Sequence, residues 1–137
     1  MIGHIETIVL DAEGLSAWMA QDRKVIAMMR VFQEIGSEFV ISANTIVEVS
    51  HARVNLQRLQ WALSLVKVEP VTEASAKAAA KLLKAAGLHG HKYAIDASVA
   101  EVALRQPGPV AMLTSDLDDM ARLCDGRVRL IGCWGGA

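Results

Sequence analysis

Short apolar runs alternate along this chain with longer stretches in which apolar residues recur every three or four positions. The apolar runs predict strands at residues 7–10, 39–41, 66–71, 110–113 and 128–131. The longer stretches predict helices, the clearest being residues 22–36, 56–66, 72–87 and 93–105. Asp22 and Asn44 precede two of the helical stretches and are predicted to cap them. Strands alternating with helices are typical of a parallel sheet covered on both faces, so the predicted fold class is α/β.

The composition places the chain among small globular proteins. Its 137 residues, 53% of them hydrophobic, are enough for one domain, and no interdomain linker is visible. There is no run of about 18 apolar residues that would predict a membrane span, and the N-terminus does not resemble a signal peptide. Cys124 and Cys133 both lie in apolar surroundings, which predicts reduced, buried thiols and a cytoplasmic protein.

Four carboxylates fall at corresponding places in this pattern. Asp11 follows the first strand, Glu48 lies near the start of the helix after the second, Asp96 is predicted in the first turn of its helix, and Asp116 follows the strand at 110–113. Right-handed crossovers bring strand ends and helix starts to one edge of a parallel sheet. Each residue has a structural alternative: a turn, an exposed helical position, a favourable place in the helix dipole, or a cap. Their joint placement favours a shared site.

Such a cluster is energetically unfavourable without a counter-ion. Two like charges about 4 Å apart repel by about 1 kcal/mol in water, and by about 4 kcal/mol at an effective dielectric constant of 20. Carboxylate oxygens favour hard cations such as Mg²⁺ or Mn²⁺. A divalent ion with open water positions can activate water for attack on a phosphodiester.

The ordered set of motifs resembles the PIN-domain ribonucleases, and specifically the small VapC-type toxins of toxin–antitoxin systems. The matching segments are Ile-Val-Leu-Asp at 8–11, Asn-Thr-Ile-Val-Glu at 44–48, Tyr-Ala-Ile-Asp at 93–96 and Leu-Thr-Ser-Asp at 113–116. The resemblance implies a single PIN-like domain over residues 1–137, built as a three-layer α/β/α sandwich around a central parallel sheet. It also implies a Mg²⁺- or Mn²⁺-dependent endoribonuclease that forms a homodimer and is neutralised by a cognate antitoxin.

The same resemblance assigns roles to individual residues. The catalytic acids would be Asp11, Glu48, Asp96 and Asp116, and the metal site would consist of Asp11, Glu48, Asp96, Asp116 and Asp119. Asp118 is the competitor of Asp119 and is predicted to be the helix cap instead. Thr114 and Ser115 are predicted to orient a carboxylate or a water. One departure is that Asp11 lies several residues further into the chain than is usual in the family.

The sequence says less about the substrate and the partners. Fourteen basic residues stand against 15 acidic ones, a net charge of −1, so no strongly basic nucleic-acid footprint is present. An RNA substrate, with tRNA and rRNA as candidates, would depend on local cations, for which the candidates are Arg23, Lys24, Arg53 and Lys92. An apolar groove for the antitoxin or a second copy is predicted around Phe32, Leu59 and Trp61.

Other functional classes receive weaker support. The chain contains no nucleophile elbow, no phosphate-binding loop and no dinucleotide-binding fingerprint. The alternative that stays open is a non-catalytic PIN-like module that binds RNA or a protein. The complete set of acids favours the nuclease over this alternative.

Overall fold

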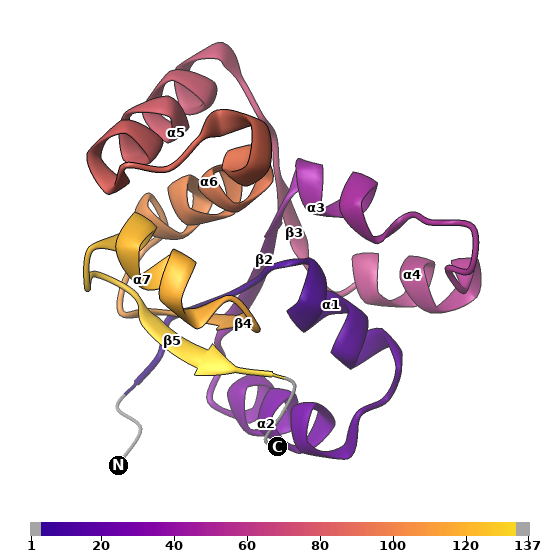
Figure 1. The fold of residues 1–137 in the computed structure, drawn as a ribbon. Coiled ribbons are helices and arrows are strands. Elements are labelled where there is room, and N and C mark those ends of the chain that lie inside the picture. Colours follow the sequence, from indigo (N-terminus) through magenta and orange to yellow (C-terminus); the bar gives the residue numbers. More distant parts are fainter. Residues whose placement is uncertain (1–3, 134–137) are drawn as a thin grey trace.

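Five parallel strands form the centre of the molecule, which is known here from a computed structural model describing residues 4–133 (Figure 1). The sheet has the order β3-β2-β1-β4-β5. The strand bounds are β1 Thr7–Leu10, β2 Glu38–Ser42, β3 Lys67–Glu69, β4 Val110–Thr114 and β5 Arg129–Gly132. All four pairings between neighbouring strands are parallel, which confirms the predicted α/β class.

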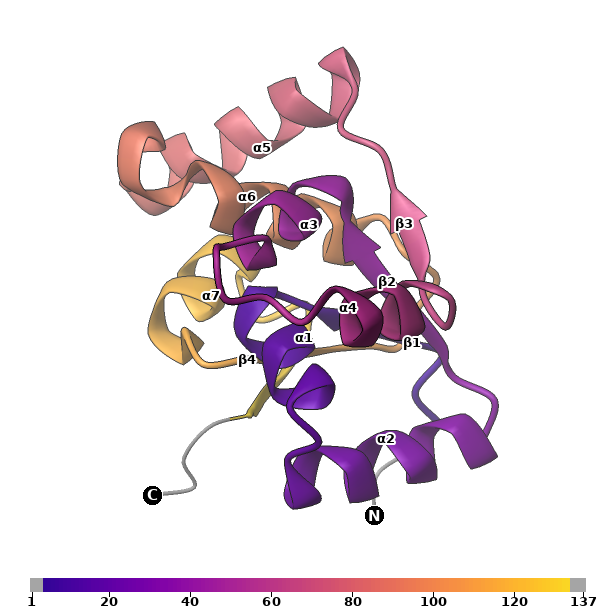
Figure 2. The same ribbon diagram turned by 90° about the vertical axis from the view of Figure 1, so that its right-hand side faces the viewer.

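Helices cover both faces of the sheet and give three layers (Figures 1 and 2). One face carries α1 (Ala12–Met19), α2 (Arg23–Glu34) and α4 (Leu56–Leu63). The other carries α5 (Glu73–Ala86), α6 (Gly90–Leu104) and α7 (Leu117–Cys124), while the short α3 (Ala43–Val49) contacts both α1 and α6. The three-layer α/β/α sandwich is thereby confirmed. Over the described residues, no helix is long and apolar enough to cross a membrane.

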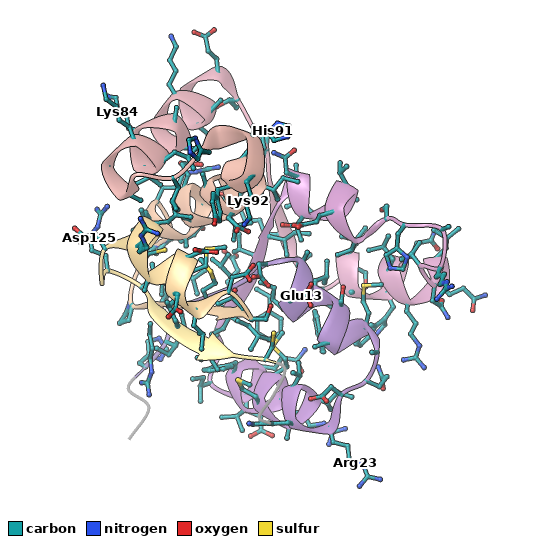
Figure 3. All side chains as sticks on the ribbon, in the orientation of Figure 1. Glu13, Arg23, Lys84, His91, Lys92 and Asp125 are labelled. Carbon is teal, nitrogen blue, oxygen red and sulfur yellow. The ribbon has the colours of Figure 1, made fainter. Side chains whose placement is uncertain are left out.

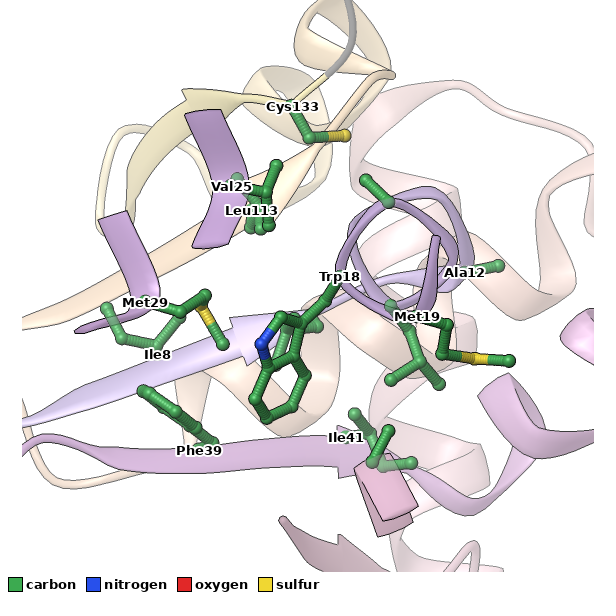
Figure 4. Packing of buried hydrophobic residues seen from close by; sticks show 14 of the residues in the cluster. Ile8, Ala12, Trp18, Met19, Val25, Met29, Phe39, Ile41, Leu113 and Cys133 are labelled. Atoms are coloured by element: carbon green, nitrogen blue, oxygen red, sulfur yellow. The ribbon is translucent and has the colours of Figure 1, made fainter. Parts of the chain in front are cut away.

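The central strands β1 and β4 are almost entirely apolar because both of their faces are buried. Ile8 of β1 belongs to the core under α1 and α2, whereas the next residue, Val9, belongs to the core under α6 and α7. Trp18 of α1 packs its ring edge-to-face against Phe39 of β2, with ring centroids 5.5 Å apart (Figure 4). Each layer is therefore fixed to the sheet by its own apolar cluster.

Several local predictions hold and others need correction. Asp22 caps α2 by accepting a hydrogen bond from the Val25 N–H at 3.0 Å, as predicted. Asn44 is not a cap, because the Ser42 hydroxyl accepts from the Asn44 N–H and takes that position. The helix predicted from residue 93 begins at Gly90, which places Asp96 in the second turn.

The apolar groove predicted from three residues is wrong for two of them. Phe32 is 1% exposed and Leu59 is 6% exposed, so both belong to the core, whereas Trp61 is 40% exposed. Cys124 and Cys133 are free and buried, as predicted. The strand predicted at 128–131 is β5, Arg129–Gly132, and residues 134–137 lie outside the described residues.

Candidate active site

The strand order places a topological switch point between β1 and β4. The chain proceeds outward from β1 through β2 to β3 and then returns to the opposite side of β1 with β4. In open parallel sheets, ligands bind in the crevice beyond the carboxyl ends of the strands at such a point. Asp11 follows the last residue of β1, and Asp116 lies two residues beyond the end of β4. Both predicted acids therefore lie at the place where this fold offers a site.

Asp11 is held in one orientation by hydrogen bonds from two directions. Its side chain is the N-cap of α1, and Oδ1 accepts from the Gly14 N–H at 2.9 Å. Oδ2 accepts from the hydroxyl of Thr114, which in turn accepts from the Asp116 N–H at 2.9 Å. Asp11 is 3% exposed and Thr114 is fully buried. A chain of hydrogen bonds therefore links the ends of β1 and β4 and fixes the carboxylate, which is the orienting role predicted for Thr114.

Gly14 allows α1 to lie directly against the end of β4. A Cβ atom at this position would lie 2.4 Å from the carbonyl oxygen of Leu113, a backbone atom that cannot rotate away. The close approach also allows the Asp11 N–H to donate to this Leu113 oxygen at 3.3 Å. A residue without a side chain is therefore needed here to bring Asp11 within reach of Thr114.

Glu48 and Asp96 enter the site from two helices that are tied together. Glu48 lies on α3 and is exposed, while Asp96 lies on α6 and is half-buried. The Asn44 side-chain amide donates to the Ser98 hydroxyl at 3.3 Å and joins the two helices. This contact gives Asn44 a positioning role in place of the capping role that its sequence position predicted.

The pKa of Asp96 shows how strongly the acids affect one another. Burial first, and then the charges of Asp116, Glu48, Asp11 and Asp119, raise it from an ordinary 3.8 to about 7. These four residues lie at the start of α1, on α3 and at the start of α7. The fold therefore brings all five predicted metal-site acids within electrostatic range of one another.

The other acids show the same direction of shift. Burial raises the pKa of Asp11 to about 6, although the hydrogen bonds from Thr114 and Gly14 oppose the rise. The pKa values of Glu48 and Asp116 are also raised, by burial first and then by neighbouring carboxylates. Over the described residues, Asp11, Glu48, Asp96 and Asp116 have no Lys or Arg as an ion-pair partner.

Comparison with known proteins assigns the chain to a family. The sequence pattern of the PIN domain matches residues 8–125, which is most of the chain. This chain belongs to the PIN domain family. Its fold is similar to VapBC2 from Rickettsia felis bound to a DNA fragment from their promoter, at 15% identity and a TM-score of 0.71, covering 94% of this chain and 99% of that one. It is also similar to FitAB bound to the IR36 DNA fragment, at 19% identity and a TM-score of 0.68, covering 93% of this chain and 96% of that one. No curated protein sequence matches the chain.

The two acids that begin α7 in this PIN domain behave differently. The charge of Asp119 raises the pKa values of both Asp96 and Asp116, whereas Asp118 is not among the causes of either shift. The predicted cap is wrong, because Asp116 occupies the N-cap position of α7 and its side chain makes no capping hydrogen bond. Asp119 is therefore the first-turn acid that is electrostatically coupled to the cluster.

Glu13 is an acid that the sequence reasoning did not place in the site. Its charge contributes to the raised pKa values of Asp11, Glu48 and Asp116. Figure 3 shows Glu13 near the middle of the molecule, whereas Asp125 lies at its outer edge. The available signal was its position in the first turn of α1, two residues after Asp11, from which a helical side chain can face the same crevice.

The donor set of this PIN domain fits a hard divalent cation that keeps part of its hydration shell. All the candidate ligands are carboxylates, and their mutual repulsion leaves an unmet demand for positive charge. Among residues 4–133, however, no three His, Cys, Asp or Glu side chains are grouped closely enough to hold an ion by themselves. Mg²⁺ suits such an open arrangement, because it usually binds through one or two carboxylates and retains several waters.

Proposed function

We propose that this PIN domain is a metal-dependent endoribonuclease of the VapC type, a toxin that a cognate antitoxin neutralises. The observation that carries the proposal is the carboxylate cluster around Asp11, Asp96 and Asp116, whose members raise one another's pKa values and have no cationic partner among the described residues. A purely structural role would not favour bringing so many like charges to the switch point of the sheet.

The chain's own groups divide the work at this site. A bound Mg²⁺ or Mn²⁺ would neutralise the carboxylates, activate a water and stabilise the developing charge on a phosphodiester. We assign the ion to Asp11, Asp96 and Asp116, directly or through retained waters. Glu48 and Asp119, whose charges act on Asp96, would orient the attacking water. The Thr114 hydroxyl and the Gly14 N–H hold the Asp11 carboxylate so that it need not reorganise during the reaction.

Support for the toxin assignment comes from the solved structures with the same fold. VapBC2 and FitAB were both solved bound to DNA fragments, and the chains that resemble this protein match it over nearly their whole length. We propose that this chain binds a small cognate antitoxin protein and that it forms a homodimer. Val47 and Leu56 are 69% and 65% exposed, so apolar surface is available for such contacts. The two free, buried cysteines agree with the cytoplasmic location that we propose for the protein.

The nuclease is tested with purified protein and total cellular RNA. Wild-type protein is incubated with Mg²⁺, with Mn²⁺ or with chelator, beside an Asp96→Asn variant purified in the same way. We expect discrete cuts that require the metal and are lost in the variant. An Asp125→Asn variant, which removes the same charge at the outer edge of the molecule, is the matched control and should cut like wild type (Figure 3).

Each result discriminates between the possible roles. Cuts that persist in Asp96→Asn would identify a contaminating nuclease and would refute the assigned site. RNA binding without cleavage in every condition would favour the non-catalytic PIN-like module. Light scattering of the wild-type protein tests the homodimer, which a purely monomeric mass would exclude.

A further inference from the structure

A cavity formed in part by α1 and α3, the helices that also carry Asp11 and Glu48, has basic residues in its lining. It has a volume of about 330 Å³ and lies between the end of α1, the end of α3 and the loop that leads into α4. Its lining includes apolar residues, Met19, Val49 and Val54, and basic residues, His51, Arg53 and Arg58. No Asp or Glu is among the residues that line it. The cavity therefore combines an apolar surface with cations.

The cavity and the acids share two helices. Ser16 and Met19 line the cavity from α1, the helix that Asp11 caps, and Val49 lines it from α3, one residue after Glu48. At a rise of about 1.5 Å per residue, Ser16 and Met19 lie roughly 7.5 and 12 Å beyond Asp11 along the helix axis. A stacked nucleic-acid strand advances about 3.4 Å per nucleotide, so this distance corresponds to about two to three nucleotides.

Two of the basic groups are fixed at the cavity by the backbone. The Arg58 guanidinium donates to the Met19 carbonyl at 3.2 Å, which holds it across the end of α1. The Arg53 N–H donates to His51 Nδ1 at 3.1 Å, so a neutral His51 ring carries its proton on Nε2 as a donor. Arg53 itself is exposed and, over the described part of the chain, forms no ion pair with an acid.

These features suit a single unpaired nucleotide. Unpaired bases of RNA stack on aromatic rings, His included, or on Arg guanidinium planes, and their phosphates pair with cations. A volume of about 330 Å³ is at the small end of the range for small-ligand sites, which suits one nucleoside better than a partner helix. The protein has a net charge of −1 and an acidic site, so RNA would need local cations to approach it.

We propose that this cavity is a nucleotide subsite, which holds one unpaired nucleotide of the RNA substrate about two to three nucleotides from the bond to be cut. The inference rests on the proposed ribonuclease function. It restricts the substrate to single-stranded segments and assigns Arg53, Arg58 and His51 to its recognition. Of the basic residues that the sequence offered as phosphate contacts, it selects Arg53 alone.

The test measures binding of a short, fluorescently labelled single-stranded oligoribonucleotide of random sequence. Binding is measured in the Asp96→Asn background with Mg²⁺, so that the oligonucleotide is not cut. Adding Arg53→Gln removes one exposed cation from the cavity, and adding Ala20→Leu fills the cavity without changing its charge. Arg129→Gln is the matched control, because Arg129 is exposed at the first residue of β5, at the opposite end of the parallel strands.

We expect Arg53→Gln to weaken binding by about 3- to 10-fold and to lower the slope of log K against log salt by about 0.7, the value for one phosphate contact on a single strand. Ala20→Leu should weaken binding with an unchanged slope, and Arg129→Gln should change neither quantity. A duplex of the same sequence should be insensitive to both cavity variants. Equal affinities of Arg53→Gln, Ala20→Leu and Arg129→Gln for the single-stranded oligonucleotide would overturn the proposal. It would also be overturned if the two cavity variants bound the oligonucleotide normally and lost only the binding of a protein partner.

A cleavage assay separates this inference from the proposed ribonuclease function. In it, total RNA is incubated with proteins that carry the same substitutions but retain Asp96. If wild type cuts and the Arg53→Gln and Ala20→Leu proteins cut and bind like Arg129→Gln, the nuclease stands and the subsite is refuted. If wild type does not cut, the proposed nuclease fails, and the binding measurements still decide whether the cavity recognises RNA.

Discussion

Replacing Asp96 by Asn should stabilise the metal-free protein at high pH and leave it little changed at low pH. Asp96 has a pKa of about 7 in the folded protein against an ordinary 3.8. Folding therefore favours the protonated form, and the folded state takes up a proton between these values. Wild-type stability must fall as the pH rises through this window, and the penalty is complete above pH 7 or so. Asn carries no charge and escapes the penalty.

The size of the effect follows from the same pKa. At about 1.4 kcal/mol per pKa unit, the difference sets an upper limit of about 4 kcal/mol. Asp96 is only half-buried, and water near the carboxylate reduces the interaction, so we expect about 2 kcal/mol at pH 8 and close to zero at pH 4. The measurement is urea denaturation of both proteins at the two pH values, in chelator, compared through the free energy of unfolding.

A metal arm and a control complete the design. Saturating Mg²⁺ should stabilise wild type, by about 2.7 kcal/mol at 100 times its dissociation constant, and should stabilise Asp96→Asn less. Asp125→Asn removes a charge outside the cluster and should respond to Mg²⁺ like wild type. A difference between Asp96→Asn and wild type that does not change with pH, or equal responses to Mg²⁺, would refute the shared anionic site.

Two further changes test the framework that holds Asp11, and a third tests a buried hydroxyl on α3. Gly14→Ala should lower the free energy of unfolding, measured in urea, by about 1–3 kcal/mol. The clash of the new Cβ with the Leu113 carbonyl should exceed the gain of about 0.5–1 kcal/mol that Ala gives in a helix. An increase in stability would show that α1 can move away from β4. Thr114→Val should lower the free energy of unfolding by about 1–3 kcal/mol at pH 8, because it leaves the buried Asp11 carboxylate without its hydroxyl donor. Thr114→Ser keeps a hydroxyl and should lose much less. Equal losses in the two variants would assign the effect to packing. Thr45 has a buried hydroxyl without a hydrogen-bond partner among the described atoms, so Thr45→Val should raise the free energy of unfolding by about 1 kcal/mol, and a decrease would reveal a polar partner such as a bound water.

The main features of the fold were predictable because they depend on local pattern. Met112 lies in a run, 110–113, that is apolar at every position, as expected for a strand buried on both faces. The Thr72 cap and the left-handed Gly87 end of α5 were also readable, since capping chemistry acts within a few residues. Element ends were less certain, and the start of α6 was missed because His89 makes no side-chain capping bond.

The site was predictable only as a set of acids at equivalent places. The positions of Asp11, Glu48, Asp96 and Asp116 followed from the alternation of strands and helices together with the handedness of the crossovers. The part played by Glu13 did not follow, because a helical acid carries no mark of the direction that it faces until the helix is docked. The same reason explains the correction for Asn44, whose partner Ser98 lies 54 residues away.

The sequence by itself determined the succession of strands and helices along the chain, the apolar core and the identity of the acids. These features depend on periodicity and on residue chemistry. What only the tertiary structure decided is how close the acids lie to one another, which of them is buried, and which basic residues line the cavity between α1, α3 and α4. Those properties depend on the packing of α1 against β4 through Gly14 and on the loop between α3 and α4. Burial and charge act through space, and distances through space are set by packing between residues far apart in the chain.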